Sequence, residues 1–121
     1  MKRESIAIQL GSRQYLQNGP DEIGRTHIGY EPGLSDEQIY EAGRGLWALN
    51  PNRLFGADHI FIVTNQGEVL IEINLTGIQR VENGKYYITG DINKNSEYVG
   101  QYINVNTSRN RINYIETNNL L

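Results

Sequence analysis

The chain has no cysteine among its 121 residues, which excludes disulfides and thiolate metal sites. No stretch approaches the roughly 18 apolar residues of a membrane-spanning helix, and the N-terminus lacks the apolar core of a signal peptide. Basic residues are not in excess either, since 11 Lys and Arg face 14 Asp and Glu for a net charge of −3. Proteins that hold long nucleic acids usually present a basic face. We therefore expect a cytoplasmic protein of a bacterial cell with no membrane partner, for which nucleic acid is a disfavoured partner.

What is present is an ordinary globular composition. Hydrophobic residues make up 38% and charged residues 21% of the chain, which favours a folded protein over a disordered one. The length suits one hydrophobic core, so we predict a single domain over residues 1–121. The 14 Asn and 15 Ile are typical of AT-rich coding DNA, as in a low-GC bacterium or one of its phages.

The clearest predicted element is a helix over residues 35–47. Ser35 is a good N-cap, and Gln38 occupies the capping-box position three residues on. Gly43 and Gly45 weaken the helix, so either a neighbour packs closely there or the helix frays by Gly45. Apolar residues share one face at helical spacing, namely Ile39, Ala42, Leu46 and Trp47.

The rest of the chain favours strands. Turns at residues 65–67 and 83–84 mark two hairpins, and short helical turns are expected after Asn50 and Ser96. The fold class is therefore α+β, with a single, mostly antiparallel sheet of about six strands packed against the main helix. Seven segments show strand patterns and are the candidates for these strands: residues 5–10, 59–64, 68–74, 78–81, 85–90, 102–105 and 111–115.

The domain divides into three parts along the sequence. Residues 1–34 are expected to give one half-buried strand and an irregular segment, and residues 35–115 the helix and sheet core. Residues 116–121 are expected to fray. The strands at 59–64 and 68–74 are apolar at nearly every position, which predicts that they lie in the covered centre of the sheet.

Five stretches together resemble a small module found in bacterial and phage chains, alone or beside nuclease domains of the HNH and GIY-YIG kinds. They are SDEQIYEAGRGLWAL, ADHIFIV, GEVLIEI, EYVG and NRINYI, within residues 35–115. In that module a helix ending in Arg-x-x-Trp precedes an Ala-Asp-Tyr-like strand, and an Asn-x-Ile-x-Tyr segment closes the domain. The resemblance implies a compact α+β domain of PUA-like style, used for recognition rather than cleavage. Two features depart from it: His59 stands where the module more often has an aromatic residue, and about 30 residues precede the match.

The candidate ligand-binding residues combine cationic, aromatic and amide side chains. A guanidinium binds phosphate through two hydrogen bonds, an aromatic ring stacks on a base, and an Asn amide reads a base edge. Trp47 could instead be the largest core residue, with the arginines simply solvated. The candidates are Arg44, Trp47, Arg53, Arg109, Arg111, Asn113 and Tyr114.

No catalytic, metal or cofactor site is expected. The only histidines, His27 and His59, lie far apart in the sequence, and no Ser stands in a nucleophile setting. His59 beside Asp58 could act as a general base, but a locally hydrogen-bonded His explains the same pattern. The GRG run at residues 43–45 lacks the strand-to-helix context and the following Lys of a phosphate loop. We therefore expect a protein that is not an enzyme.

These features favour a non-catalytic protein that captures a small, phosphate-bearing, nucleotide-type ligand. In a phage, a stand-alone domain of this kind would resemble sponge proteins that sequester a host immune signal, such as a cyclic nucleotide or a cyclic ADP-ribose species. Such an anti-defence protein needs affinity rather than catalysis, and we expect a homo-oligomer. The alternative is an accessory nucleic-acid-recognition domain that works with a nuclease. A hydrolase or cyclase built on His59 and a carboxylate is a third hypothesis.

Overall fold

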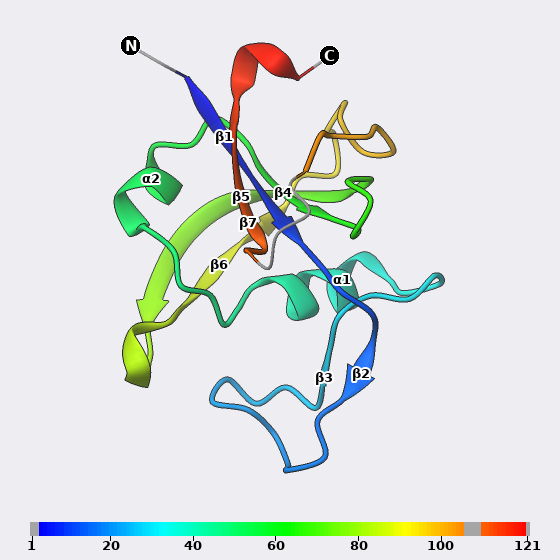
Figure 1. Cartoon of the computed structure of the whole chain (residues 1–121), viewed down its shortest axis with the longest axis vertical. Helices are drawn as coiled ribbons and strands as arrows, with labels where there is room; N and C mark the ends of the chain where they lie inside the picture. The colour runs from blue at the N-terminus through cyan, green and yellow to red at the C-terminus, as the bar shows by residue number, and fades with distance from the viewer. Residues whose placement is uncertain (1–2, 106–109, 121) are drawn as a thin grey trace.

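The computed structural model describes residues 3–105 and 110–120, and it confirms the α+β class. A five-stranded mixed sheet packs against one main helix, and a separate two-stranded sheet extends from one end of the molecule (Figure 1). None of the helices in the described part of the chain is long and apolar enough to cross a membrane.

The main sheet has the strand order β6-β5-β4-β1-β7. β1 runs parallel to β4, and the other pairings are antiparallel. β4 is the central strand and all of its residues are buried, as its apolar sequence predicts. β1 is buried on both faces, whereas its alternating pattern predicts a half-buried strand. The bounds are β1 Glu4–Gln9, β4 Ile60–Val63, β5 Val69–Arg80, β6 Tyr86–Ile92 and β7 Ile112–Glu116.

The predicted segments at 68–74 and 78–81 are one long strand. They form β5, which stays paired with β6 across a register shift between Leu75 and Gly77. The hairpin turn that follows is confirmed: it is the 3₁₀ turn η1 (Glu82–Gly84), and Asn83 there has a φ of 68°. Asn tolerates this left-handed conformation better than most residues, which is why Asn-Gly is a strong turn signal.

Three predictions near the C-terminus differ from the structure. Residues 102–105 are not a strand, because only Tyr102 makes a single bridge, to Glu68. No helical turn follows Ser96. The end of the chain forms a second 3₁₀ turn, η2 (Thr117–Asn119), in place of the expected frayed tail. The Thr117 hydroxyl lies 2.9 Å from the Ser5 hydroxyl, so a side-chain hydrogen bond holds this turn against β1.

Helix α1 (Asp36–Gly43) begins at Ser35 as predicted, with both hydrogen bonds of the capping box formed. It ends at Gly43 instead of residue 47, because the following residues pair with the outer edge of β6. Trp47 and Tyr86 exchange two backbone hydrogen bonds of 2.9 Å. An unpaired sheet edge is a liability, and this pairing outweighs the helix preference of residues 44–47. Trp47 therefore does not lie on the helix.

The sequence offers two explanations for the glycines at the helix end, and the structure bears out one for each residue: close packing for Gly43 and the end of the helix for Gly45. A Cβ atom at Gly43 would lie 2.3 Å from the Ile62 side chain, so the helix packs closely on β4 at this point. Gly45 lies beyond the helix end, where a Cβ atom would lie 2.7 Å from the Tyr87 Cβ. The short helix α2 (Pro51–Phe55) follows, capped by the Asn50 side chain as its sequence predicts.

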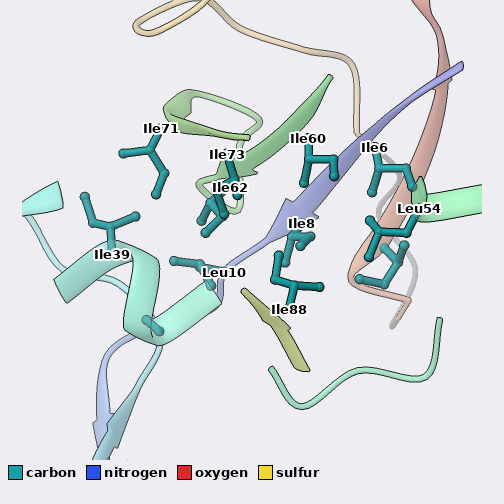
Figure 2. Packing of buried hydrophobic residues seen from close by; sticks show 12 residues of the cluster. Ile6, Ile8, Leu10, Ile39, Leu54, Ile60, Ile62, Ile71, Ile73 and Ile88 are labelled. Carbon is teal, nitrogen blue, oxygen red and sulfur yellow. The ribbon is translucent and has the colours of Figure 1, made fainter. Parts of the chain in front are cut away.

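The core has one hydrophobic cluster on each face of the sheet. The larger one lies between the sheet and the two helices, and isoleucines from all five strands of the main sheet contribute to it; Figure 2 shows most of them. The smaller one contains Ala7, Phe61, Val63, Val69 and Ile103. Tyr98, Val105 and Leu120 pack against its edge, so the loop after β6 and the chain end cover the second face.

Residues 11–30 form an arm that projects from the end of β1 (Figure 1). Its two short strands, β2 (Gln14–Tyr15) and β3 (His27–Ile28), pair antiparallel where the sequence predicts an irregular segment. At the base of the arm, Gly29 has a φ of 80°, and a Cβ atom there would lie 2.1 Å from the Ser12 carbonyl oxygen. Only glycine lets the two sides of the arm come this close.

Candidate functional site

A cavity of about 420 Å³ lies where the arm, the end of β1 and the segment after α1 meet. Its lining residues include Trp47 and two arginines, Arg25 and Arg111. None of the described residues that line it carries a carboxylate, although the chain as a whole is acidic. The lining residues are Gln9, Leu10, Gly11, Ser12, Gln14, Arg25, Ile28, Gly29, Ala42, Gly45, Leu46, Trp47 and Arg111.

Trp47 belongs both to the cavity and to the core. It is half-buried and packs against the larger hydrophobic cluster. Its Nε1–H donates to the Gly43 carbonyl oxygen at 2.7 Å, and its backbone is fixed by Tyr86. The indole N–H is thus occupied inside the protein, which leaves the flat ring as the part that a ligand can use. A fixed aromatic face stacks on nucleobases with little sequence preference.

Arg111 approaches the cavity from the start of β7. Its Nη1 donates to the Asn65 Oδ1 at 2.7 Å, and the same oxygen accepts the Gln9 Nε2 at 3.0 Å. Gly11 makes room for this arginine, because a Cβ atom at Gly11 would lie 3.4 Å from Arg111 Nη2. Asn65 therefore orients one edge of the guanidinium of this cavity-lining residue.

Asn113 lies behind the cavity and does not line it. It is buried, and its Nδ2 lies 3.4 Å from both the Ala7 carbonyl oxygen and the Gln9 Oε1. Because the Gln9 amide is held on both sides, by Asn65 and by Asn113, it forms a fixed part of the wall. The position of Asn113 indicates a supporting role, whereas the sequence suggests that it reads a base.

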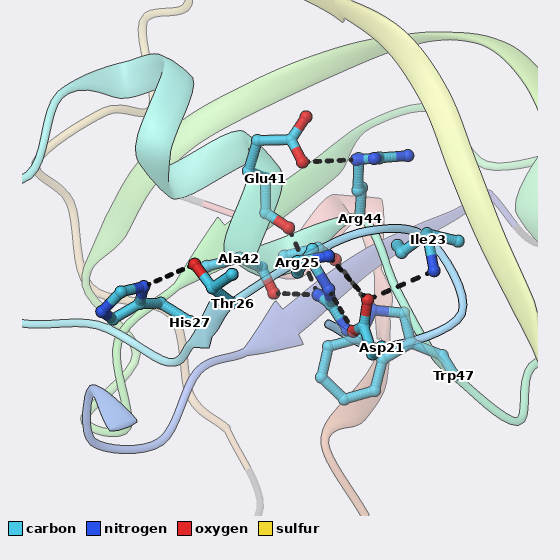
Figure 3. A network of polar contacts seen from close by, with 10 residues as sticks. Asp21, Ile23, Arg25, Thr26, His27, Glu41, Ala42, Arg44 and Trp47 are labelled. Carbon is cyan, nitrogen blue, oxygen red and sulfur yellow. Dashed lines mark hydrogen bonds and ion pairs between the residues drawn. The ribbon is translucent and has the colours of Figure 1, made fainter. Parts of the chain in front are cut away.

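Arg25 is the second guanidinium of the cavity, with a side chain only 6% exposed. Its Nε donates to the Asp21 Oδ2 at 2.8 Å, and its Nη1 donates to the Glu41 and Ala42 carbonyl oxygens at 3.2 and 3.1 Å (Figure 3). Burial raises the pKa of Asp21, but the hydrogen bonds and charge of Arg25 outweigh this effect, so the pKa lies below its usual value.

The remaining candidates do not join the cavity. Arg44 pairs with Glu41 at 3.1 Å and lies 5.4 Å from the centre of the Tyr87 ring. Arg53 and Tyr114 form a separate cluster. Arg109 lies outside the described residues.

The Arg53 cluster is held together at the protein surface. The Arg53 guanidinium carbon lies 3.4 Å from the centre of the Tyr114 ring, and its Nε donates to the Glu4 Oε2 at 3.0 Å. The hydrogen bond from Arg53 is the main cause of the lowered pKa of Glu4. Arg53 and Tyr114, which the sequence groups with Trp47, therefore contact each other and are not among the residues that line the cavity.

His59 is paired with Glu72, not with its neighbour Asp58. The His59 Nδ1 lies 2.7 Å from the Glu72 Oε2, and the Ser96 hydroxyl donates to the other oxygen of this buried carboxylate at 2.5 Å. The His59 ring stacks on Phe61 of the smaller core cluster, away from the cavity residues of the larger one. This arrangement ties the loop after β6 to the sheet. Within the described residues, no group of three potential ligands is placed to hold a metal ion.

Sequence reasoning missed Gln9, Ser12, Gln14 and Arg25. All lie in the first 30 residues, where no strong pattern marks a site. One signal was available: Asp21 and Arg25 are opposite charges four residues apart, a spacing that suggests an ion pair. Nothing local could indicate that this pair would lie beside Trp47 and Arg111.

Comparison with known proteins found no family model, curated protein or solved structure that matches this chain. The resemblance to a PUA-like recognition module therefore stays a prediction from its short motifs. Only the geometry of the cavity and the chemistry of its walls bear on function.

Proposed function

We propose that this protein is a non-catalytic binding protein that holds a small, phosphate-bearing, nucleotide-type ligand in the cavity beside Trp47. The proposal rests on one observation. A net-acidic chain has a cavity whose described lining residues include a tryptophan and two arginines but no Asp or Glu. A phosphate and a planar base are the two chemical groups that match this lining.

The cavity volume refines the size of the ligand. Ligand pockets usually span about 300–1,000 Å³, so 420 Å³ is near the small end of the range. One nucleotide unit suits this space better than two, which favours a mononucleotide or a cyclic mononucleotide over a cyclic dinucleotide. Gln14 and Ser12 add polar groups to the wall on the arm side.

In its biological form, the proposal is stoichiometric capture. A bacterial or phage protein in the cytoplasm could lower the free concentration of a nucleotide signal without converting it, as an anti-defence sponge would. This role requires affinity and copy number, which a small domain provides. Homo-oligomer formation would raise the number of sites per particle.

The first experiment is a fluorescence titration, because Trp47 is the only tryptophan and lines the cavity. AMP, cyclic AMP, cyclic GMP and cyclic ADP-ribose would be added one at a time, with a single-stranded oligonucleotide in parallel. We expect saturable quenching by at least one nucleotide, weakened in Arg111→Ala and retained in Arg53→Ala. Quenching by none of them, together with oligonucleotide binding that falls steeply with salt, would favour the nucleic-acid alternative.

A further inference from the structure

Arg25 has the features of a ligand-holding group that is fixed in advance. We propose that Arg25 forms the anion subsite of the cavity, where it takes the phosphate of the ligand, and that Asp21 is the residue that positions it. This inference rests on the proposed function and deepens it, since it assigns the phosphate end of the ligand to one side of the cavity.

The hydrogen bonds of Arg25 fix the plane of its guanidinium. Nε is held by Asp21, and Nη1 is held by two carbonyl oxygens in the last turn of α1. Within the described part of the chain, Nη2 makes no hydrogen bond. Since the guanidinium is planar and rigid, contacts on two of its nitrogens decide where the third one points. Figure 3 shows Asp21, Arg25 and Trp47 gathered below the end of α1.

Burying this charge has a cost that packing alone does not explain. An apolar side chain of similar volume often replaces a buried ion pair without loss of stability. The carbonyl oxygens at the end of α1 need partners, but water or a neutral donor could supply them. A charged group that is almost fully buried, lines a cavity and keeps one nitrogen unpaired suits anion binding better than it suits scaffolding.

Asp21 acts through Arg25 and does not line the cavity itself. Its Oδ1 accepts the Arg25 backbone N–H at 2.8 Å and the Ile23 N–H at 3.2 Å, so it also shapes the turn that carries Arg25. Asp21 therefore has two opposite effects on a bound anion. It repels the anion as a negative charge, and it holds the guanidinium that attracts the anion.

The test uses this opposition. Inorganic phosphate is titrated into the full chain, and the NMR signals of the Arg25 Nε–H and the Trp47 Nε1–H are followed. In the unmodified protein we expect both signals to move together. In Asp21→Asn, which removes the charge but keeps the shape, we expect phosphate to bind about tenfold more weakly, the order of one lost hydrogen bond to a charged group.

Glu41→Gln is the matched control. It removes the same charge near the same turn of α1, but Arg25 contacts only the backbone carbonyl of Glu41. We expect its phosphate affinity to be unchanged or slightly higher. If Asp21 serves only as a counter-charge, Asp21→Asn should bind phosphate more tightly, and that result would overturn the positioning role. Phosphate shifts that leave the Arg25 signal in place would overturn the subsite.

A second variant keeps the test decisive if Asp21→Asn unfolds the arm. Arg25→Lys preserves the charge but loses the planar fork, so we expect weaker phosphate binding at equal net charge. Failure of this inference is also distinct from failure of the proposed function. Nucleotide quenching of Trp47 with no phosphate effect at Arg25 contradicts the subsite alone. Phosphate binding at Arg25 with no nucleotide binding contradicts the proposed function alone.

Discussion

Arg25 and Arg53 are two ion-paired arginines in very different surroundings. The Arg25 side chain is 6% exposed and lines the cavity together with Trp47. The Arg53 side chain is 44% exposed, and Tyr114 and Glu4 occupy it from two sides. The sequence favours Arg53, which stands six residues from Trp47, and marks Arg25 only by its spacing of four residues from Asp21.

The comparison shows what makes an arginine available to a ligand. Arg53 has both its ring partner and its carboxylate partner at the surface, so its binding groups are already occupied. Arg25 is held through two of its nitrogens by Asp21 and the end of α1, it is a lining residue of the cavity, and its third nitrogen makes no hydrogen bond within the described residues. Orientation by the surrounding protein, and not proximity to an aromatic residue in the sequence, separates a candidate binding group from a surface ion pair.

Replacing each arginine by methionine should give the largest difference between the two regions. Arg25→Met leaves the Asp21 carboxylate unpaired and two carbonyl oxygens without their donor, so we expect a loss of roughly 3–5 kcal/mol in unfolding free energy. Arg53→Met should cost no more than about 1 kcal/mol, as exposed pairs usually do. Urea denaturation followed by circular dichroism measures both. Equal losses would show that burial does not distinguish the two pairs.

The next largest difference should be in the nucleotide affinity of variants of the two aromatic residues, Trp47 and Tyr114. Trp47→Ala should weaken the binding of any nucleotide that enters the cavity by about tenfold or more, since a base stacked on an aromatic ring is worth about 1–3 kcal/mol. Tyr114→Ala should leave that affinity unchanged. Calorimetric titration is the suitable method, because the first variant lacks the fluorescent reporter. A comparable loss in Tyr114→Ala would place the ligand at the Arg53 cluster instead.

The carboxylate partners should give a smaller effect that depends on pH. The pKa of Asp21 and that of Glu4 both lie below their usual values. Each ionised carboxylate therefore stabilises the folded protein above its unfolded pKa of about 4, and this contribution is lost as the pH falls through the lower folded pKa. We expect the melting temperature to decrease as the pH is lowered from about 5 to about 2.

Two variants distinguish the contributions of the Asp21 and Glu4 carboxylates when melting temperature is measured over the same pH range. Asp21→Asn should flatten the pH dependence more than Glu4→Gln, because the Asp21 side chain is 17% exposed and that of Glu4 is 31% exposed. An identical pH profile for the two variants would argue that the Asp21 pair is no better shielded from water than the Glu4 pair.

Salt should give the smallest effect. At about 1 M ionic strength the Debye length falls to roughly 3 Å, so the exposed Arg53–Glu4 pair should lose most of its few tenths of a kcal/mol. The buried Arg25–Asp21 pair should change little. Double-mutant cycles for each pair, at low and at high salt, measure this directly. A strong salt dependence of the Arg25–Asp21 coupling would mean that water reaches the pair.

Much of the fold follows from local signals. The capping box at Ser35 and Gln38 sets the start of α1, and Asn50-Pro51 sets the start of α2. The Asn83-Gly84 turn is encoded by residues that tolerate left-handed backbone. The end of α1 is different, because residues 44–47 leave the helix to pair with β6, a strand that lies some 40 residues further along the chain. Residues that are neighbours in the sequence do not reveal that the edge of a distant strand will pair with them.

The candidate site was only partly predictable for the same reason. Trp47 and Arg111 are both candidates from their residue types, and the structure brings both to one cavity. Asn113 and Arg53 look equally suitable in the sequence, yet one supports the Gln9 amide and the other is held by Glu4. Which partners each side chain meets depends on the register of β7 against β1.

The sequence by itself determined the α+β class, the start of each helix, the buried centre of the sheet and a protein without thiol chemistry. Each of these follows from the preferences of residues that are close together in the chain. Only the tertiary structure decided that the arm folds back beside α1, that Arg25 is buried there, and that Trp47 and Arg111 share a cavity with it. Those outcomes depend on hydrogen bonds and packing between distant segments, which exist only once the sheet has formed.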